Sequence, residues 1–158
     1  MAGSDSEPPA LLSSGLNSTA RITALARFRM GLHELQIERG RYAVAGQRQR
    51  RSQRVCGLCG GLEDEAHLIF ECPAYDEARA RAHNLFRCIP RPEAADLGAR
   101  MREFMNPRPG QENPRFWHEM ADFLIACFET RTACTAIMMG RCHARGLVLT
   151  ASCLFTRI

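Results

Sequence analysis

The sequence predicts a mainly α-helical protein, a small helical domain stapled by a metal-binding knuckle, with a disordered N-terminal tail and a poorly defined C-terminal end. Three observations lead to this prediction. Apolar residues recur at intervals of three and four along several segments, which is the spacing of one helix face. Prolines and glycines fall near the ends of these segments. Cysteine and histidine residues are spaced as metal ligands within one short stretch.

Composition and periodicity divide the chain into five segments. The first is rich in serine, proline and glycine and lacks periodicity, so we expect it to be disordered. The segments are a tail at 1–19, a basic helix with an arginine-rich connector at 20–54, the knuckle with a helix at 55–88, a helical extension at 89–140, and an undefined tail at 141–158.

The second segment begins with an amphipathic helix. From Ala20 onward its apolar stripe has the helical period, and Gly31 is a weak point within it. The residues of this stripe are Ile22, Leu25, Phe28, Leu32 and Leu35. Residues 40–54 lack apolar periodicity and are predicted to form a connector.

The third segment carries the pattern Cys56-x2-Cys59-x7-His67-x4-Cys72. Four nitrogen or sulfur ligands are what a structural zinc ion takes, and a tight turn lets a Cys-x2-Cys pair reach one ion. Glycines at 57, 60 and 61 allow that turn. We therefore predict one structural Zn²⁺ ion. The alternative is a chance cluster in a cysteine-rich chain.

The second ligand pair sets a geometrical condition. On a regular helix, residues five apart point about 140° apart and could not both face one ion. Cys72 should therefore lie where the helix ends, and Pro73 favours this because the residue before a proline is pushed out of the α region. Asp64 is the predicted N-cap of this short helix, with Glu63 and Glu65 beside its positive end.

Three further helices are predicted downstream. Their stripes, in chain order, are Tyr75, Ala78, Ala82 and Leu85, then Ala94, Leu97, Met101 and Phe104, then Phe116, Met120, Phe123 and Cys127. In the first of these helices, Glu77 and Arg81 are spaced for an i,i+4 ion pair. The second should begin near Pro92 and end at Asn106-Pro107. The third should begin with Asn113 as N-cap and Pro114 at N1, and end near Met139-Gly140.

Charge is unevenly distributed. All 21 basic residues are arginines, which excludes mechanisms that need a lysine, such as a Walker A loop or a Schiff base. Nine of them lie in residues 21–54 against two glutamates. Guanidinium groups match phosphate oxygens, so RNA or DNA is the expected partner. The predicted nucleic-acid-binding residues are Arg27, Arg29, Arg41, Arg48, Arg50, Arg51 and Arg54. A solvated basic loop and a nuclear-localisation signal remain alternatives.

The sequence also bears on location. Residues 1–20 lack a secretory signal, and no apolar run approaches the roughly 18 to 20 residues that span a bilayer. We expect an intracellular protein, nuclear or cytoplasmic, with reduced thiols and no membrane span.

The knuckle and its surroundings resemble a known family. The pattern Arg29-x-Gly31-x-His33, the basic connector, the four predicted ligands and Cys72-Pro-Ala-Tyr75 followed by Arg79 are similar to the zinc-binding region downstream of LINE-type reverse transcriptases of non-LTR retrotransposons. The resemblance covers roughly residues 20 to 88. It implies a non-catalytic module that helps a polymerase to hold nucleic acid, and a chain that is a fragment or stand-alone remnant of such a protein.

Two other function classes are alternatives. A protein-interaction module would use the apolar helix 116–128 to dock a reverse-transcriptase polypeptide or another partner. A metalloenzyme would need an open coordination position, against which four good ligands argue. His33 is predicted to pack or cap, and Cys88, Cys127 and Cys134 to be small buried apolar groups. Cys142-His143 has no identifiable partners. We expect no enzymatic activity, since no nucleophile, base and orienting group can be named together.

Overall fold

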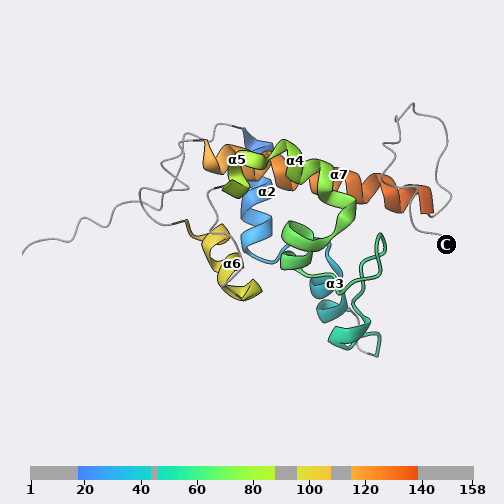
Figure 1. Ribbon diagram of the computed structural model, residues 1–158. Coiled ribbons are helices and arrows are strands. Elements are labelled where there is room, and N and C mark those ends of the chain that lie inside the picture. The colour runs from blue at the N-terminus through green and yellow to red at the C-terminus, as the bar shows by residue number, and fades with distance from the viewer. Residues whose placement is uncertain (1–17, 44–45, 88–95, 108–114, 139–158) are drawn as a thin grey trace, which may run out of the picture.

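The other helices are arranged around one long helix, α7 (Phe116–Met138), in this computed structural model (Figure 1). The structure describes residues 18–43, 46–87, 96–107 and 115–138. The remaining helical elements are α2 (Thr19–Arg29), α3 (Gln36–Tyr42), η1 (Arg51–Gln53), η2 (His67–Glu71), η3 (Pro73–Tyr75), α4 (Asp76–Arg81), α5 (His83–Arg87) and α6 (Leu97–Met105). Within the described ranges the extended pairing is a single isolated bridge, Val55 with Leu62, so the mainly helical prediction is confirmed.

Helix α7 is buried because it is apolar on more than one face. Its predicted stripe is buried, and Trp117 and Leu124 are buried beside it. Helices α2, α4 and α5 pack against it. Burying a large apolar side chain contributes about 1.5–3 kcal/mol, so this helix supplies much of the core. The helix is described to Met138, close to its predicted end, whereas the predicted cap at Asn113 and Pro114 lies outside the described residues.

Helix α2 is shorter than the sequence predicts. It ends at Arg29, because Gly31 adopts a left-handed φ of 66°. The backbone N–H of Leu32 donates to the carbonyl of Arg27 at 2.8 Å, and that of Gly31 to Phe28 at 3.2 Å, which is a Schellman cap. The predicted stripe is therefore divided. Its members at 25, 28 and 35 are buried, and those at 22 and 32 are exposed.

Helix α3 occupies part of the segment that was predicted to be a connector. It continues to Tyr42, and its buried Gly40 faces the side chain of Arg54. A Cβ atom at Gly40 would lie 2.9 Å from Arg54 Cγ and Nε, so glycine makes room for that packing. The connector prediction was wrong for residues 40–42, because this end of the helix has no apolar stripe and packs instead against Arg54, the last residue of the predicted connector.

The stripe after Pro73 is confirmed, but it is divided among the three short elements η3, α4 and α5. Tyr75, Ala78 and Leu85 are buried, and the helix is interrupted at Ala82 between α4 and α5. The predicted Glu77–Arg81 ion pair is present.

Helix α6 joins the core through one aromatic residue. The Phe104 ring lies 5.9 Å from that of Phe70 and 6.0 Å from that of Phe86, measured between centroids. The helix ends before Asn106, as predicted, and Pro92 and Ala94 lie outside the described residues.

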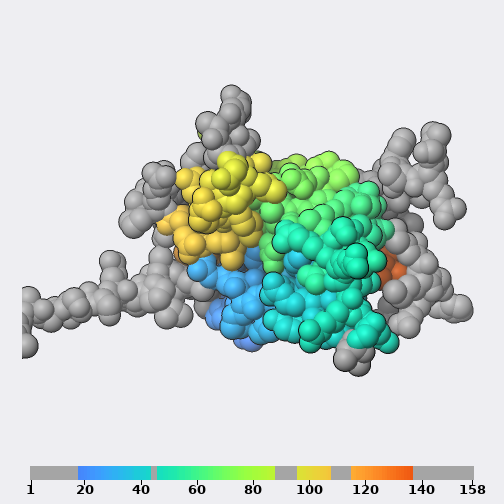
Figure 2. Space-filling model, turned by 90° about the horizontal axis from the view of Figure 1, so that it is seen from below, coloured from blue at the N-terminus to red at the C-terminus, as the bar shows by residue number. Residues whose placement is uncertain are grey.

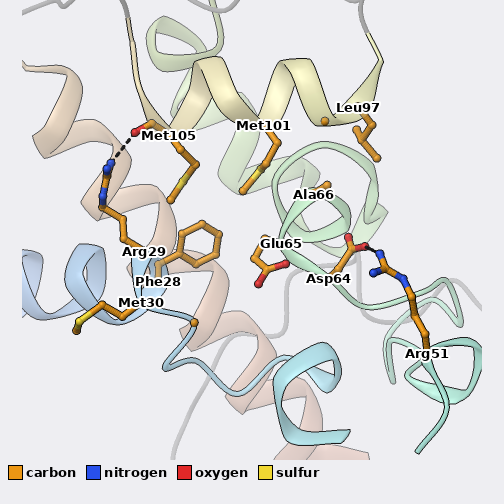
Figure 3. A pocket seen from close by; sticks show the side chains of 12 residues that line it. Phe28, Arg29, Met30, Arg51, Asp64, Glu65, Ala66, Leu97, Met101 and Met105 are labelled. Atoms are coloured by element: carbon orange, nitrogen blue, oxygen red, sulfur yellow. Dashed lines mark hydrogen bonds and ion pairs between the residues drawn. The ribbon is translucent and has the colours of Figure 1, made fainter. Parts of the chain in front are cut away.

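An open pocket of about 570 Å³ separates α6 from the end of α2 and the start of the knuckle helix. Figure 2 shows this face, with α6 in yellow. The side chains of Met101 and Met105 point into the pocket from α6, opposite Phe28, Asp64 and Glu65 (Figure 3). None of the described helices is long and apolar enough to cross a membrane.

Candidate metal centre

The four predicted ligands come together at one point. The ligand atoms of Cys56, Cys59, His67 and Cys72 all lie within 4.8 Å of one another. The Sγ atom of Cys72 is 3.9 Å from that of Cys56 and 3.7 Å from that of Cys59, and Cys59 Sγ is 3.2 Å from His67 Nε2. Ligand atoms held about 2.3 Å from one ion at tetrahedral angles lie about 3.8 Å apart. The cluster therefore has the dimensions of a site for one metal ion.

The first pair of ligands lies on a tight loop. The backbone N–H of Cys56 donates to the carbonyl of Gly61 at 2.6 Å, and that of Gly60 to the carbonyl of Cys56 at 2.8 Å. The φ of Gly60 is 81°, a left-handed conformation that favours glycine. A Cβ atom on Gly61 would lie 2.8 Å from the His67 ring, whereas one on Gly57 would meet nothing within 4 Å. Two of the three predicted turn glycines are thus required by geometry.

A π-helical turn aligns the second pair. Residues His67–Glu71 are π-helical, and the N–H of Cys72 donates to the carbonyl of His67 at 2.8 Å, five residues back. A π turn has more residues per turn than an α turn, so side chains five apart face nearly the same way. As predicted, Cys72 then leaves the helix in an extended conformation (φ −66°, ψ 119°) before Pro73. The proline prediction is confirmed, and the π turn is the part of the explanation that the sequence did not indicate.

Acidic side chains hold this turn at both ends. Asp64 Oδ1 accepts a hydrogen bond from the N–H of His67 at 3.0 Å, which confirms the predicted N-cap. Glu71 Oε2 lies 3.5 Å from His67 Nδ1. A carboxylate on Nδ1 fixes the ring so that Nε2 faces the three sulfur atoms.

Arg79 satisfies the carbonyl groups that the turn leaves without donors. From α4 its guanidinium donates to the carbonyls of Leu68 at 3.3 Å, Ile69 at 3.4 Å and Cys72. These are the groups that a helix C-terminus leaves unpaired. The position of Cys72 therefore depends on a residue seven positions downstream.

The three thiols differ in acidity because they share hydrogen bonds. The hydrogen bond with Cys72 lowers the pKa of Cys56 to about 4, although burial opposes this. The same bond, with burial, raises the pKa of Cys72 above its ordinary value, and burial raises that of Cys59. The shifts have opposite directions at Cys56 and Cys72 because the two thiols share one hydrogen bond. Metal binding to cysteine requires the thiolate form, so a divalent cation would displace thiol protons on binding.

A buried ion pair that the sequence analysis missed ties the knuckle to α7. Glu63 is 1% exposed and bonds to Arg131. It also accepts the backbone N–H of Gln36 at 2.7 Å, the first residue of α3, and Arg131 donates to the carbonyl of Glu34 at 3.2 Å. Burial raises the pKa of Glu63, and the Gln36 N–H and the Arg131 charge oppose that shift. No local pattern could have revealed a pair 68 residues apart.

The three residues of the Arg29-x-Gly31-x-His33 pattern each have an intramolecular role. Arg29 donates to the carbonyl of Met105 at 2.5 Å, and its guanidinium lies 5.6 Å from the centre of the Trp117 ring. Gly31 forms the helix cap described above. His33 is buried, with Nε2 3.1 Å from Glu65 Oε1. It is not one of the four clustered residues, in agreement with the packing prediction.

Several of the predicted nucleic-acid-binding arginines are also engaged within the protein. Arg54 donates to the carbonyls of Ile37 at 3.0 Å and Gln49 at 2.9 Å. Arg27 donates to the carbonyl of Leu32 at 3.3 Å. With Arg29, these side chains have roles in the fold that the sequence did not indicate.

The other four predicted arginines are exposed. Arg41 pairs with Glu38 at 3.4 Å, and Arg51 with Asp64 at 3.1 Å. The guanidinium groups of Arg48 and Arg50 have no side-chain partner among the described residues, and the same is true of Arg39, which the sequence analysis did not select. The guanidinium groups of Arg39, Arg48 and Arg50 are therefore available to an external anion.

The remaining cysteines that the structure describes are buried, as the sequence predicts. Cys127 and Cys134 are buried on α7. Cys88 and the pair Cys142-His143 lie outside the described residues. A comparison of this chain with protein-family models, with curated proteins and with solved structures finds no match.

Proposed function

We propose that the protein is a zinc-dependent, non-catalytic nucleic-acid-binding module, in which one structural Zn²⁺ ion fixes the knuckle and the exposed arginines beside it bind phosphate groups. The observation that carries the proposal is the convergence of three sulfurs and one imidazole nitrogen at tetrahedral spacing. Three thiolates and a histidine are a ligand set that selects zinc among common intracellular metals.

A structural role follows from the number of ligands. Four protein ligands fill a tetrahedral zinc ion and leave no position for water or substrate. The two carboxylates that could assist a bound water are otherwise engaged, since Glu65 contacts His33 and Glu71 lies beside His67 Nδ1. These contacts support binding as the function.

The position of the arginines supports nucleic acid as the ligand. Arg48, Arg50 and Arg51 are exposed and immediately precede Cys56. Guanidinium groups form bidentate hydrogen bonds with phosphate oxygens. The family resemblance of residues 20 to 88 also favours nucleic acid as the ligand. We therefore propose a relationship to the zinc-binding region of LINE-type reverse transcriptases.

Salt dependence tests this function. The triple variant Arg48→Gln, Arg50→Gln, Arg51→Gln should keep its zinc and its helical circular dichroism but bind RNA and DNA oligonucleotides more weakly in fluorescence anisotropy. Each lost phosphate contact should reduce the slope of log K against log salt by about 0.7 to 0.9. A slope equal to that of the wild type would refute the phosphate role of these arginines.

A second candidate function is the docking of a protein partner, such as a reverse-transcriptase polypeptide. The apolar face of α7 cannot serve for this, because Phe116, Met120 and Phe123 are buried in the core. The open pocket beside α6 is a different apolar surface, and its methionines, Met101 and Met105, are adaptable packing groups. Replacement of Met101 by glutamate should abolish partner binding if this surface is used, and should leave oligonucleotide binding unchanged.

A further inference from the structure

Tyr42 is the most exposed of the large apolar residues that the structure describes, at 73% exposure. The other aromatic side chains in the described ranges are buried or half-buried. An exposed tyrosine alone is ordinary. The groups that surround this one point to a ligand.

The first of these groups is Arg41. Its guanidinium carbon lies 5.9 Å from the centre of the Tyr42 ring. This contact covers part of the ring with a cation and leaves most of the side chain in solvent. A planar guanidinium beside an exposed aromatic ring is a surface on which a nucleobase can stack.

The second group consists of cations brought from further along the chain. The N–H of Gln49 donates to the carbonyl of Gly40 at 3.3 Å, so the end of α3 lies beside residues 46–54 (Figure 1). Arg54 bonds to the carbonyls of both Ile37 and Gln49 and holds the two segments together. Tyr42 and Arg48 each lie within two residues of this junction.

The charge of this surface is positive. Glu38 is the acidic residue closest in sequence, and it is paired with Arg41. The guanidinium groups of Arg39, Arg48 and Arg50 are exposed and, within the described part of the chain, have no partner. The surface therefore combines unpaired cations with one solvent-exposed aromatic ring.

We infer that Tyr42 stacks on an unpaired nucleobase and that the ligand of the arginine surface is single-stranded nucleic acid. This inference rests on the proposed function. Phosphate contacts alone do not distinguish a single strand from a duplex. In a duplex the faces of the bases are stacked on one another, whereas in a single strand they can meet an aromatic side chain. An exposed ring among cations therefore favours a single strand over a duplex as the ligand.

Three variants of the full-length, zinc-loaded protein test the inference. Tyr42→Ala removes the ring, Tyr42→Trp keeps a stacking surface, and Ile22→Ala removes an exposed apolar side chain on α2 as a matched control. Their affinities for a fluorescent 12-nucleotide single strand, as oligo-dU and oligo-U, and for a 12-base-pair duplex would be measured by anisotropy at a series of salt concentrations.

The expected result is selective. Tyr42→Ala should bind the single strands about 5- to 150-fold more weakly, and its duplex affinity and salt slope should equal those of the wild type. Tyr42→Trp and Ile22→Ala should bind as the wild type does. The oligo-dU and oligo-U arms differ only in the sugar, so they show whether a ribose hydroxyl contributes.

Other results would overturn the inference in distinguishable ways. If Tyr42→Ala keeps its single-strand affinity while the Arg48, Arg50, Arg51 triple variant loses it, the stacking role is wrong and the phosphate role stands. Equal losses on single strand and duplex would also remove the stacking role. If the wild type binds neither ligand, the proposed function and the inference are both wrong.

Discussion

The backbone N–H of Cys72 donates to the carbonyl of His67 at 2.8 Å, across five residues, and this π-type hydrogen bond turns both side chains toward the same point. On a regular α-helix they would diverge by about 140°. The spacing of four residues between the last two ligands is therefore accommodated by a local change in helix type. Pro73 then ends this helix at Cys72, the last of the four predicted ligands.

Gly61 is expected to be essential for metal binding. Gly61→Ala would place a Cβ atom 2.8 Å from the His67 ring and displace Nε2 from the three sulfurs. We predict a loss of zinc affinity of at least tenfold in competition with a chromophoric chelator, comparable to other changes that disturb ligand orientation.

Gly57→Ala is the matched control for that variant. It lies in the same loop, but a Cβ atom there meets nothing within 4 Å. Its zinc affinity should equal that of the wild type. Equal affinities for the two variants would contradict the account of the loop.

Arg131 is predicted to be important for stability. Arg131→Met leaves the Glu63 carboxylate buried without its cation, and breaking a buried pair in this way costs about 3–5 kcal/mol. Urea unfolding at pH 7 measures the difference. Arg21→Ala, which removes an exposed partner of Asp122, should change the free energy of unfolding little. If both variants unfold at the same urea concentration, the buried pair does not stabilise the fold.

Arg79 should stabilise the knuckle from α4. Arg79→Ala leaves the carbonyls of Leu68, Ile69 and Cys72 without their donor, and hydrogen bonds from a charged group contribute about 1.5–3 kcal/mol. The free energy of unfolding of the zinc-bound protein should fall by about this amount. Arg81→Ala, which removes an exposed pair with Glu77 on the same helix, should lower it by only about 0.3–0.5 kcal/mol.

Cys127 should be chemically inert in the folded protein. Burial raises the pKa of this thiol from 9.0 to about 12. At pH 8 the reactive thiolate is therefore rare, and alkylation by iodoacetamide, followed by peptide mass spectrometry, should be much slower than in urea. Alkylation at equal rates in both conditions would contradict the burial of Cys127.

The same shift predicts the direction of a stability change with pH. The pKa is higher in the folded than in the unfolded chain, so the contribution of Cys127 to stability is complete below about pH 9. It is lost as the pH rises toward 12, because only the unfolded chain then gains charge at this position. Cys127→Ala should reduce the alkaline slope of the unfolding free energy in this window.

The sequence predicted those features that depend on local spacing. The convergence of the four predicted ligands, the Asp64 cap and the stripes of α4, α5 and α7 are confirmed because each involves residues within a few turns of one another. The predicted helix through Gly31 was too long, because apolar spacing alone does not show whether a glycine will be left-handed. The periodicity of apolar residues does not distinguish a glycine inside a helix from a glycine that ends it.

Contacts between distant segments were not predictable from one sequence. The bonds from Arg29 to Met105 and from Arg131 to Glu63 join residues far apart in the chain. The residues next to Arg29 and Arg131 in the sequence do not indicate these distant partners. Their roles depend on how α2, α6 and α7 pack, which periodicity does not determine.

In the proposed function, one zinc ion held by Cys56, Cys59, His67 and Cys72 fixes the knuckle. Metal binding in such sites contributes about 10–16 kcal/mol, comparable to the stability of a whole domain. Elemental analysis of reduced, purified protein tests it most directly. We expect one zinc per chain in the wild type and none in Cys72→Ser. A folded wild-type protein that contains no zinc would contradict it.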